Sequence, residues 1–172
     1  MMEPNEVPQP ADRSAEIERA RAILLRTLSR APRSRHELRE RLVQRDIDEG
    51  IADELLDRFE EVGLIDDAQY AQMLVRTRHA ERGQARRAIA HELRRKGLSD
   101  QDSREALEQI DADDEFARAQ ELISRRIDSV RGLPRDRAIQ RLVGYLGRRG
   151  YSPAVALSVI RPALDADESG MI

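Results

Sequence analysis

Two short segments place a histidine directly before a glutamate, the pair with which a zinc-protease helix begins. They are HELRE at residues 36–40 and HELRR at residues 91–95. A zinc-protease helix needs a second histidine at the fifth position, and these segments have Glu40 and Arg95 there. The chain has 3 histidines and no cysteine. We therefore expect neither a transition-metal site nor a cofactor.

Paired carboxylates are the other residues that could do chemistry. Asp66-Asp67 and Asp113-Asp114 could act as an acid and a base, but both pairs stand where predicted helices begin, so capping is the better interpretation. The sequence has no phosphate-binding loop, no dinucleotide glycine pattern and no nucleophile elbow. It thus predicts a binding protein rather than an enzyme. Turnover of a nucleotide or nucleic acid by the purified chain would reveal an unrecognised active site.

Arginines gathered on two predicted helices are the best candidates for contact with a partner. At 100° per residue, each arginine stripe points away from the apolar face of its helix. The candidate partner contacts are Arg87, His91, Arg94, Arg95, Arg137, Arg141 and Arg148. Candidate secondary contacts are Arg78, Arg82 and Lys96. The planar guanidinium suits phosphate or carboxylate, although an ordinary solvated face is the alternative for any single arginine.

Charge alternates in blocks along the chain. Nearly all the charged residues between 46 and 67 are acidic, and most of those between 76 and 96 are basic. Acidic residues predominate again at 100–115, and basic residues at 125–149. The first part of the chain lacks an arginine stripe, because His36, Glu40 and Gln44 take the outward positions there. We therefore assign the basic character to the later parts of the chain. The net charge of −3 argues against a simple DNA-coating protein.

These side chains must be positioned by helices. Apolar residues make up 40% of the chain but aromatic residues only 3%, which favours an all-α fold packed through Leu, Ile and Ala. Apolar residues recur at helical spacing throughout, with Gly and Pro at the breaks. Ser34 and Glu37 form a capping-box pattern at one predicted helix start.

An internal repeat of about 50 residues organises the helices. Superposing Leu42, Leu93 and Leu146 also superposes the apolar residues four positions before them, and Asp48, Ser99 and Ser152 as caps after them. We predict tandem three-helix repeats at 15–65, 66–112 and 113–165, stacked in an elongated, curved array. An irregular bundle with chance similarity is the alternative.

The ends of the chain give separate expectations. Residues 1–14 contain three prolines and predict a disordered leader, and residues 166–172 predict a flexible tail. No secretory signal is recognisable, and no stretch approaches the roughly 20 apolar residues that cross a bilayer. We expect a cytoplasmic monomer with no membrane partner.

Three parts of the sequence are distinctive when taken together. They are GLIDDAQYA at 63–71 followed by IAHELRRKGL at 89–98, SRHELRERL at 34–42, and the late segment from Ile139 to Tyr151. These segments resemble the bacterial regulatory protein RecX family. The resemblance covers roughly residues 15–164 and lies in the order and spacing of these segments.

The resemblance implies a partner. Members of this family modulate the RecA recombinase, usually by inhibiting it, and are thought to lie in the groove of the filament that RecA forms on single-stranded DNA. It implies a RecA filament as partner, contact with single-stranded DNA directly or through RecA, and no catalytic residues. The rival hypothesis is a free-standing helical protein that binds nucleic acid or regulates transcription, because three-helix units can act as helix-turn-helix modules.

Overall fold

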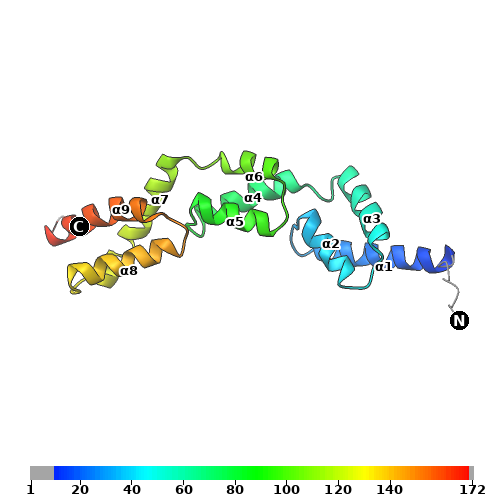
Figure 1. Ribbon diagram of the computed structural model, residues 1–172, viewed down its shortest axis with the longest axis horizontal. Helices are drawn as coiled ribbons and strands as arrows, with labels where there is room; N and C mark the ends of the chain where they lie inside the picture. The colour runs from blue at the N-terminus through cyan, green and yellow to red at the C-terminus, as the bar shows by residue number, and fades with distance from the viewer. Residues whose placement is uncertain (1–9, 171–172) are drawn as a thin grey trace, which may run out of the picture. The chain divides into compact units, whose positions relative to one another are not determined.

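The computed structural model describes residues 10–170. These residues form nine α-helices and one short 3-10 helix, with no strand among them. In chain order the helices are α1 (Pro10–Leu28), α2 (Arg35–Val43), α3 (Glu49–Glu61), α4 (Asp67–Ala80), α5 (Arg86–Arg95), α6 (Asp100–Leu107), α7 (Ala112–Ser124), η1 (Ile127–Val130), α8 (Arg135–Gly147) and α9 (Pro153–Glu168) (Figure 1). The all-α prediction is confirmed.

The chain divides into two compact units. Unit 1 contains the chain through Tyr70 together with the loop Lys96–Leu98, and unit 2 contains Ala71–Arg95 and the residues from Ser99 onward. Unit 1 therefore holds the first three-helix repeat, and unit 2 holds most of the second repeat and all of the third. The elongated, curved arrangement of the repeats stays a prediction.

The core of unit 1 is made by the apolar faces of its three helices. In this repeat α1 packs against α2 and α3, and α2 packs against α3. Leu24, Leu38, Leu42 and Leu56 have no exposed surface. The apolar stripe of each helix is thus buried against the other two, leaving the charged faces in solvent.

Unit 2 follows the same principle. In its third repeat α9 packs against α7, α8 and η1 (Figure 1). Ile123, Leu142, Leu146 and Ile160 are almost completely buried there. In the second repeat α5 packs against α6, and Ile89 and Leu93 have no exposed surface.

Local backbone geometry confirms the internal repeat. The turn after the second helix of each repeat contains a residue in the left-handed region, which glycine adopts without strain. These residues are Asp46 (φ 58°), Gly97 (φ 70°) and Gly150 (φ 92°). Two positions later a side chain caps the third helix by accepting a hydrogen bond from the backbone three residues on. These caps are Asp48, Ser99 and Ser152.

The first helix begins earlier than the sequence predicts. Residues 10–14, predicted as disordered leader, belong to α1. Pro10 is compatible with a first helical position because its missing N–H has no intrahelical acceptor there. Arg13 is held by Glu54 of α3, with 3.0 Å between Nη2 and Oε2. The remaining leader, residues 1–9, lies outside the described residues.

The last helix ends later than the sequence predicts. Residues 166–168 belong to α9, although Pro162 lies inside that helix. Arg131 pairs with Asp167, and Arg135 pairs with Asp165 and Glu168. These ion pairs hold the segment that was predicted to be flexible. Residues 171–172 lie outside the part of the chain that the structure describes.

Candidate functional site

Helix α5 presents a basic face to solvent. Its apolar side is fixed by Ile89 and Leu93, while Arg87, Arg94 and Arg95 are exposed on the other side. The first turn is anchored by Glu115 of α7, whose Oε1 accepts the backbone N–H of Arg86 at 2.7 Å. A carboxylate at the start and arginines in the last turn both complement the helix dipole.

The arginines of this face have no ionic partner within residues 10–170. None of Arg87, Arg94 and Arg95 pairs with a carboxylate there, and His91 is exposed beside them. Exposed guanidinium groups without an internal carboxylate keep their donors for an external anion. The predicted α5 contacts are therefore placed where a partner could reach them.

Helix α8 has a comparable face. Ala138, Leu142 and Leu146 are buried, and the three predicted arginines are exposed on the opposite side. These are Arg137, Arg141 and Arg148, and none forms an ion pair with a described residue.

The arginine stripes of α5 and α8 occupy mostly different positions, although both helices are the second helix of their repeat. With Leu93 superposed on Leu146, Arg95 falls on Arg148. Arg87 and Arg94, however, fall on Gln140 and Gly147. The stripes thus lie on the same helix of two repeats but share only one position.

One predicted secondary contact, Arg78, is held inside unit 2. Its Nε and Nη2 donate to the two carboxylate oxygens of Glu92 at 2.7 and 2.6 Å, and only 17% of the Arg78 side chain is exposed. This two-bond pair joins α4 to α5, so we assign Arg78 a structural role. Arg82, by contrast, is exposed.

Lys96 is also held, within unit 1. Its ammonium donates to Glu37 Oε1 at 2.8 Å and lies 5.8 Å from the centre of the Tyr70 ring. The Tyr70 hydroxyl and the Ser34 backbone N–H both donate to Glu37 Oε2, at 3.1 and 3.0 Å. We refer to Ser34, Glu37, Tyr70 and Lys96 as the Glu37 cluster. Its geometry indicates a structural role for Lys96 as well.

Protonation of the cluster follows from these bonds. Burial acts to raise the pKa of Glu37, but hydrogen bonds from Lys96, Ser34 and Tyr70 outweigh it and lower that pKa. Burial acts to lower the pKa of Lys96, but its bonds to Glu37 and Tyr70 outweigh it and raise that pKa. Both groups therefore remain charged at neutral pH.

The first repeat pairs its charges internally. Arg39 of α2 donates to Asp53 and Glu49 of α3, with contacts of 2.8 and 2.7 Å. Arg35 pairs with Asp57 and Glu60 of α3 at 2.8 and 2.6 Å. Four of the six acids of α3 are thus bound to α2.

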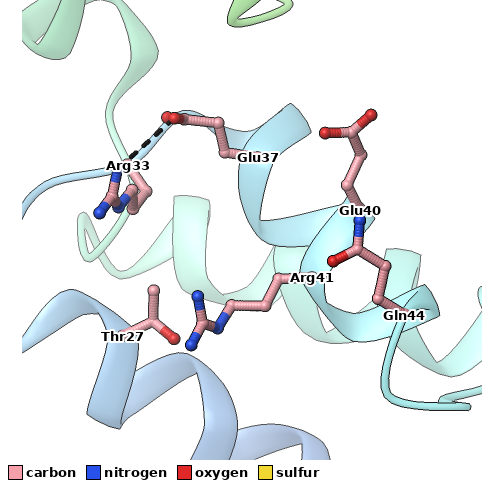
Figure 2. Close-up of a pocket in the computed structure, with 6 residues that line it drawn as sticks. All are labelled: Thr27, Arg33, Glu37, Glu40, Arg41 and Gln44. Atoms are coloured by element: carbon pink, nitrogen blue, oxygen red, sulfur yellow. Dashed lines mark ion pairs between the residues drawn. The ribbon is translucent and has the colours of Figure 1, made fainter.

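The outward face of α2 carries both signs of charge. Figure 2 shows a pocket lined by Thr27, Arg33, Glu37, Glu40, Arg41 and Gln44. Arg33 pairs with Glu37 at 3.6 Å, and His36 pairs with Glu40 at 3.3 Å. Arg41 extends from α2 toward Thr27 of α1 (Figure 2). This pocket contains both signs of charge and offers no selective anion site.

A second pocket of unit 1 is basic, which the sequence analysis missed. It has a volume of about 280 Å³ and is lined by Arg19, Ala22, Ile23, Arg26 and Arg45. Assigning all basic character to the later repeats is therefore wrong. Four of the lining residues follow the spacing of one helix face in the sequence. Arg45, from the turn after α2, joins them only in the folded chain.

Two further searches of the described residues bear on the site. No group of three or more His, Cys, Asp or Glu residues within 10–170 could hold a metal ion. In the same residues no helix is long and apolar enough to span a bilayer.

Family models match all three repeats. The first, second and third three-helix domains of RecX match residues 20–59, 66–107 and 113–160 respectively. These matches support the repeat organisation independently of the turn geometry.

Similar whole proteins carry the name regulatory protein RecX. The chain is 48% identical to the one from Streptomyces coelicolor over 151 residues, which is 88% of this chain and 80% of the relative. It is 45% identical to the one from Thermobifida fusca over 149 residues, covering 87% and 80%. The crystal structure of RecX from Lactobacillus salivarius superposes with a TM-score of 0.74 at 21% identity, covering 87% of this chain and 97% of that one. This last likeness supports the fold alone.

Proposed function

This chain belongs to the RecX family of regulatory proteins, and we propose that it binds the filament of RecA on single-stranded DNA and mainly inhibits RecA in recombination and DNA repair. The protein would act in the cytoplasm as a monomer. It would contact DNA directly or through RecA. Its relatives are named regulatory protein RecX, which supports the regulatory role.

The observation that carries this proposal is the set of unpaired arginines on α5 and α8. Arg87, Arg94 and Arg95 on α5 and Arg141 and Arg148 on α8 are exposed and bind no carboxylate of the described chain. A recombinase filament offers such residues both DNA phosphates and acidic protein side chains. Guanidinium groups bind either one with two parallel hydrogen bonds.

The test is inhibition of the DNA-dependent ATPase of RecA by a variant in which these five arginines become alanine. We expect at least a tenfold weaker inhibition, since several charge-assisted contacts at about 1.5–3 kcal/mol each would be lost. The matched control changes Arg13, Arg21, Arg58, Arg125 and Arg131 to alanine. The control loses the same charge from arginines that are paired with carboxylates of the chain, four of them exposed and Arg21 partly exposed, and it should inhibit normally.

Two results would contradict the proposal. In one, the folded α5/α8 variant inhibits RecA as well as the unchanged protein does. In the other, the unchanged protein binds a specific duplex sequence without RecA at moderate salt and does not co-sediment with RecA filaments. The second result would favour the free-standing DNA-binding alternative.

A further inference from the structure

The basic pocket of unit 1 is formed by two segments that converge on an apolar floor. Arg19 and Arg26 stand seven residues apart on α1, and therefore on one face of that helix. Ala22 and Ile23 lie between them, and Arg45 lines the pocket from the turn after α2. All three arginines are exposed.

Arg19 is held in place by the backbone. Its Nη2 donates to the carbonyl of Asp46 at 3.1 Å, in the turn where Asp46 adopts a positive φ of 58°. One bond leaves most of the five guanidinium donors of Arg19 available. The bond also joins α1 to the turn that carries Arg45, so two of the three arginines are positioned together.

The charge of the pocket is not neutralised within unit 1. Arg26 and Arg45 bind no carboxylate of the described chain. On the same helix Arg21 pairs with Glu18 at 3.1 Å, and Arg13 pairs with Glu54 at 3.0 Å. No acidic residue lines the pocket. Three guanidinium groups around a small apolar floor complement a phosphate flanked by a sugar or base.

We propose that the pocket lined by Arg19, Arg26 and Arg45 binds the phosphodiester backbone of single-stranded DNA. This inference takes its biological setting from the proposed function and deepens it by giving the first repeat its own nucleic-acid contact. The first repeat therefore binds DNA with arginines of α1 and of a turn, whereas the later repeats offer arginines of their second helices.

The test is binding of the full-length protein to a fluorescein-labelled, mixed-sequence, single-stranded oligonucleotide without RecA, across a series of salt concentrations. Arg26 and Arg45 are both changed to alanine, while Arg19 is retained because it holds the Asp46 carbonyl. We expect roughly tenfold weaker binding at low salt. The slope of log affinity against log salt should fall by about 1.4, since each lost single-strand phosphate contact removes about 0.7.

A control variant with the same charge loss changes Arg21 and Arg58 to alanine. Arg58 is exposed and Arg21 is partly exposed, and both are paired with glutamates, so the salt slope should stay as in the unchanged protein. A variant with Arg26→Lys and Arg45→Lys keeps the charge and should retain most of the slope. Thermal unfolding of every variant checks that the pocket remains folded.

The proposal fails if the Arg26/Arg45 alanine variant keeps the original salt slope, or if the control variant loses as much affinity. It also fails if the alanine variant binds DNA normally but binds DNA-free RecA more weakly, because the occupant would then be an acidic protein surface. The readout uses naked DNA, so it is independent of RecA inhibition. If the five-arginine variant of α5 and α8 inhibited RecA normally, a loss of DNA binding by the Arg26/Arg45 variant would still support the pocket. Likewise, normal DNA binding by the Arg26/Arg45 variant would not contradict the proposed inhibition of RecA.

Discussion

Helices α2 and α5 are the second helices of two successive repeats, yet they use their arginines differently. On α2, Arg35 and Arg39 bind four carboxylates of α3. On α5, Arg94 and Arg95 are exposed and bind none within the described chain. The second helix of the repeat therefore binds the third helix through its arginines in one repeat and presents exposed arginines in the next.

The difference has a local cause in the sequence. With Leu42 superposed on Leu93, the position of Arg39 is taken by Ala90, so α5 has no side chain there to reach the third helix of its repeat. Arg86 takes the position of Arg35, but it donates to the carbonyls of Leu107 and Ile110 at 3.0 Å each. A repeat can thus keep its core and change its surface through single substitutions.

The largest expected effect tests whether α2 and α5 bury equivalent positions in the cores of their repeats. Leu42 and Leu93 both have no exposed surface. Truncating either to alanine should lower the free energy of unfolding of its unit by about 3 kcal/mol, through lost burial and the cavity left behind. Urea denaturation of both variants measures this. A large effect at one leucine and a negligible effect at the other would break the comparison.

An intermediate effect is expected at the start of α2, where Glu37 takes the position of Ala88 in α5. Glu37→Ala removes the acceptor of Lys96, Tyr70 and Ser34, and should cost about 2 kcal/mol in the free energy of unfolding. Urea denaturation at neutral pH gives the value.

Glu37 should also make the stability of the protein depend on pH. Since folding lowers the pKa of Glu37, its stabilisation is complete at neutral pH and is lost as the pH falls below the ordinary value of 4.5. Glu37→Gln should therefore show a shallower acid loss of stability than the unchanged protein. If the free energy of unfolding fell equally steeply with pH in the two proteins below pH 4.5, Glu37 would contribute nothing to the pH dependence of stability.

The smallest effect on stability concerns the arginines themselves. Arg39→Ala should lower the midpoint of thermal unfolding slightly and leave RecA inhibition intact, because Arg39 binds Asp53 and Glu49. Arg94→Ala should leave the midpoint unchanged and weaken inhibition. Thermal scans and the ATPase assay on the same samples separate the two outcomes. Identical behaviour of the variants would remove the distinction between α2 and α5.

Sequence patterns between residues a few positions apart predicted most of the fold. Helical periodicity and the superposition of Leu42, Leu93 and Leu146 predicted the three repeats, and all three leucines are buried without exposed surface. The capping box of Ser34 and Glu37 is also present. These features depend on residues a few positions apart, whose relative placement a helix dictates.

Contacts of long range escaped prediction. Arg78 looked like a solvent-facing arginine because its partner, Glu92, lies 14 residues away on another helix. Lys96 and Glu37 are 59 residues apart. A stripe of charge in the sequence predicts which side chains leave the core, but the packing of helices decides which of them meet an opposite charge.

The loop Lys96–Leu98 belongs to unit 1, although it follows Tyr70 by more than twenty residues of intervening chain. Its Lys96 carbonyl accepts the Ser34 hydroxyl at 2.6 Å, and its ammonium binds Glu37. During synthesis on the ribosome, these two bonds can therefore form only after Lys96 has emerged. A fragment cut after Tyr70 would lack this loop and with it the partners of the Ser34 hydroxyl and of one Glu37 oxygen.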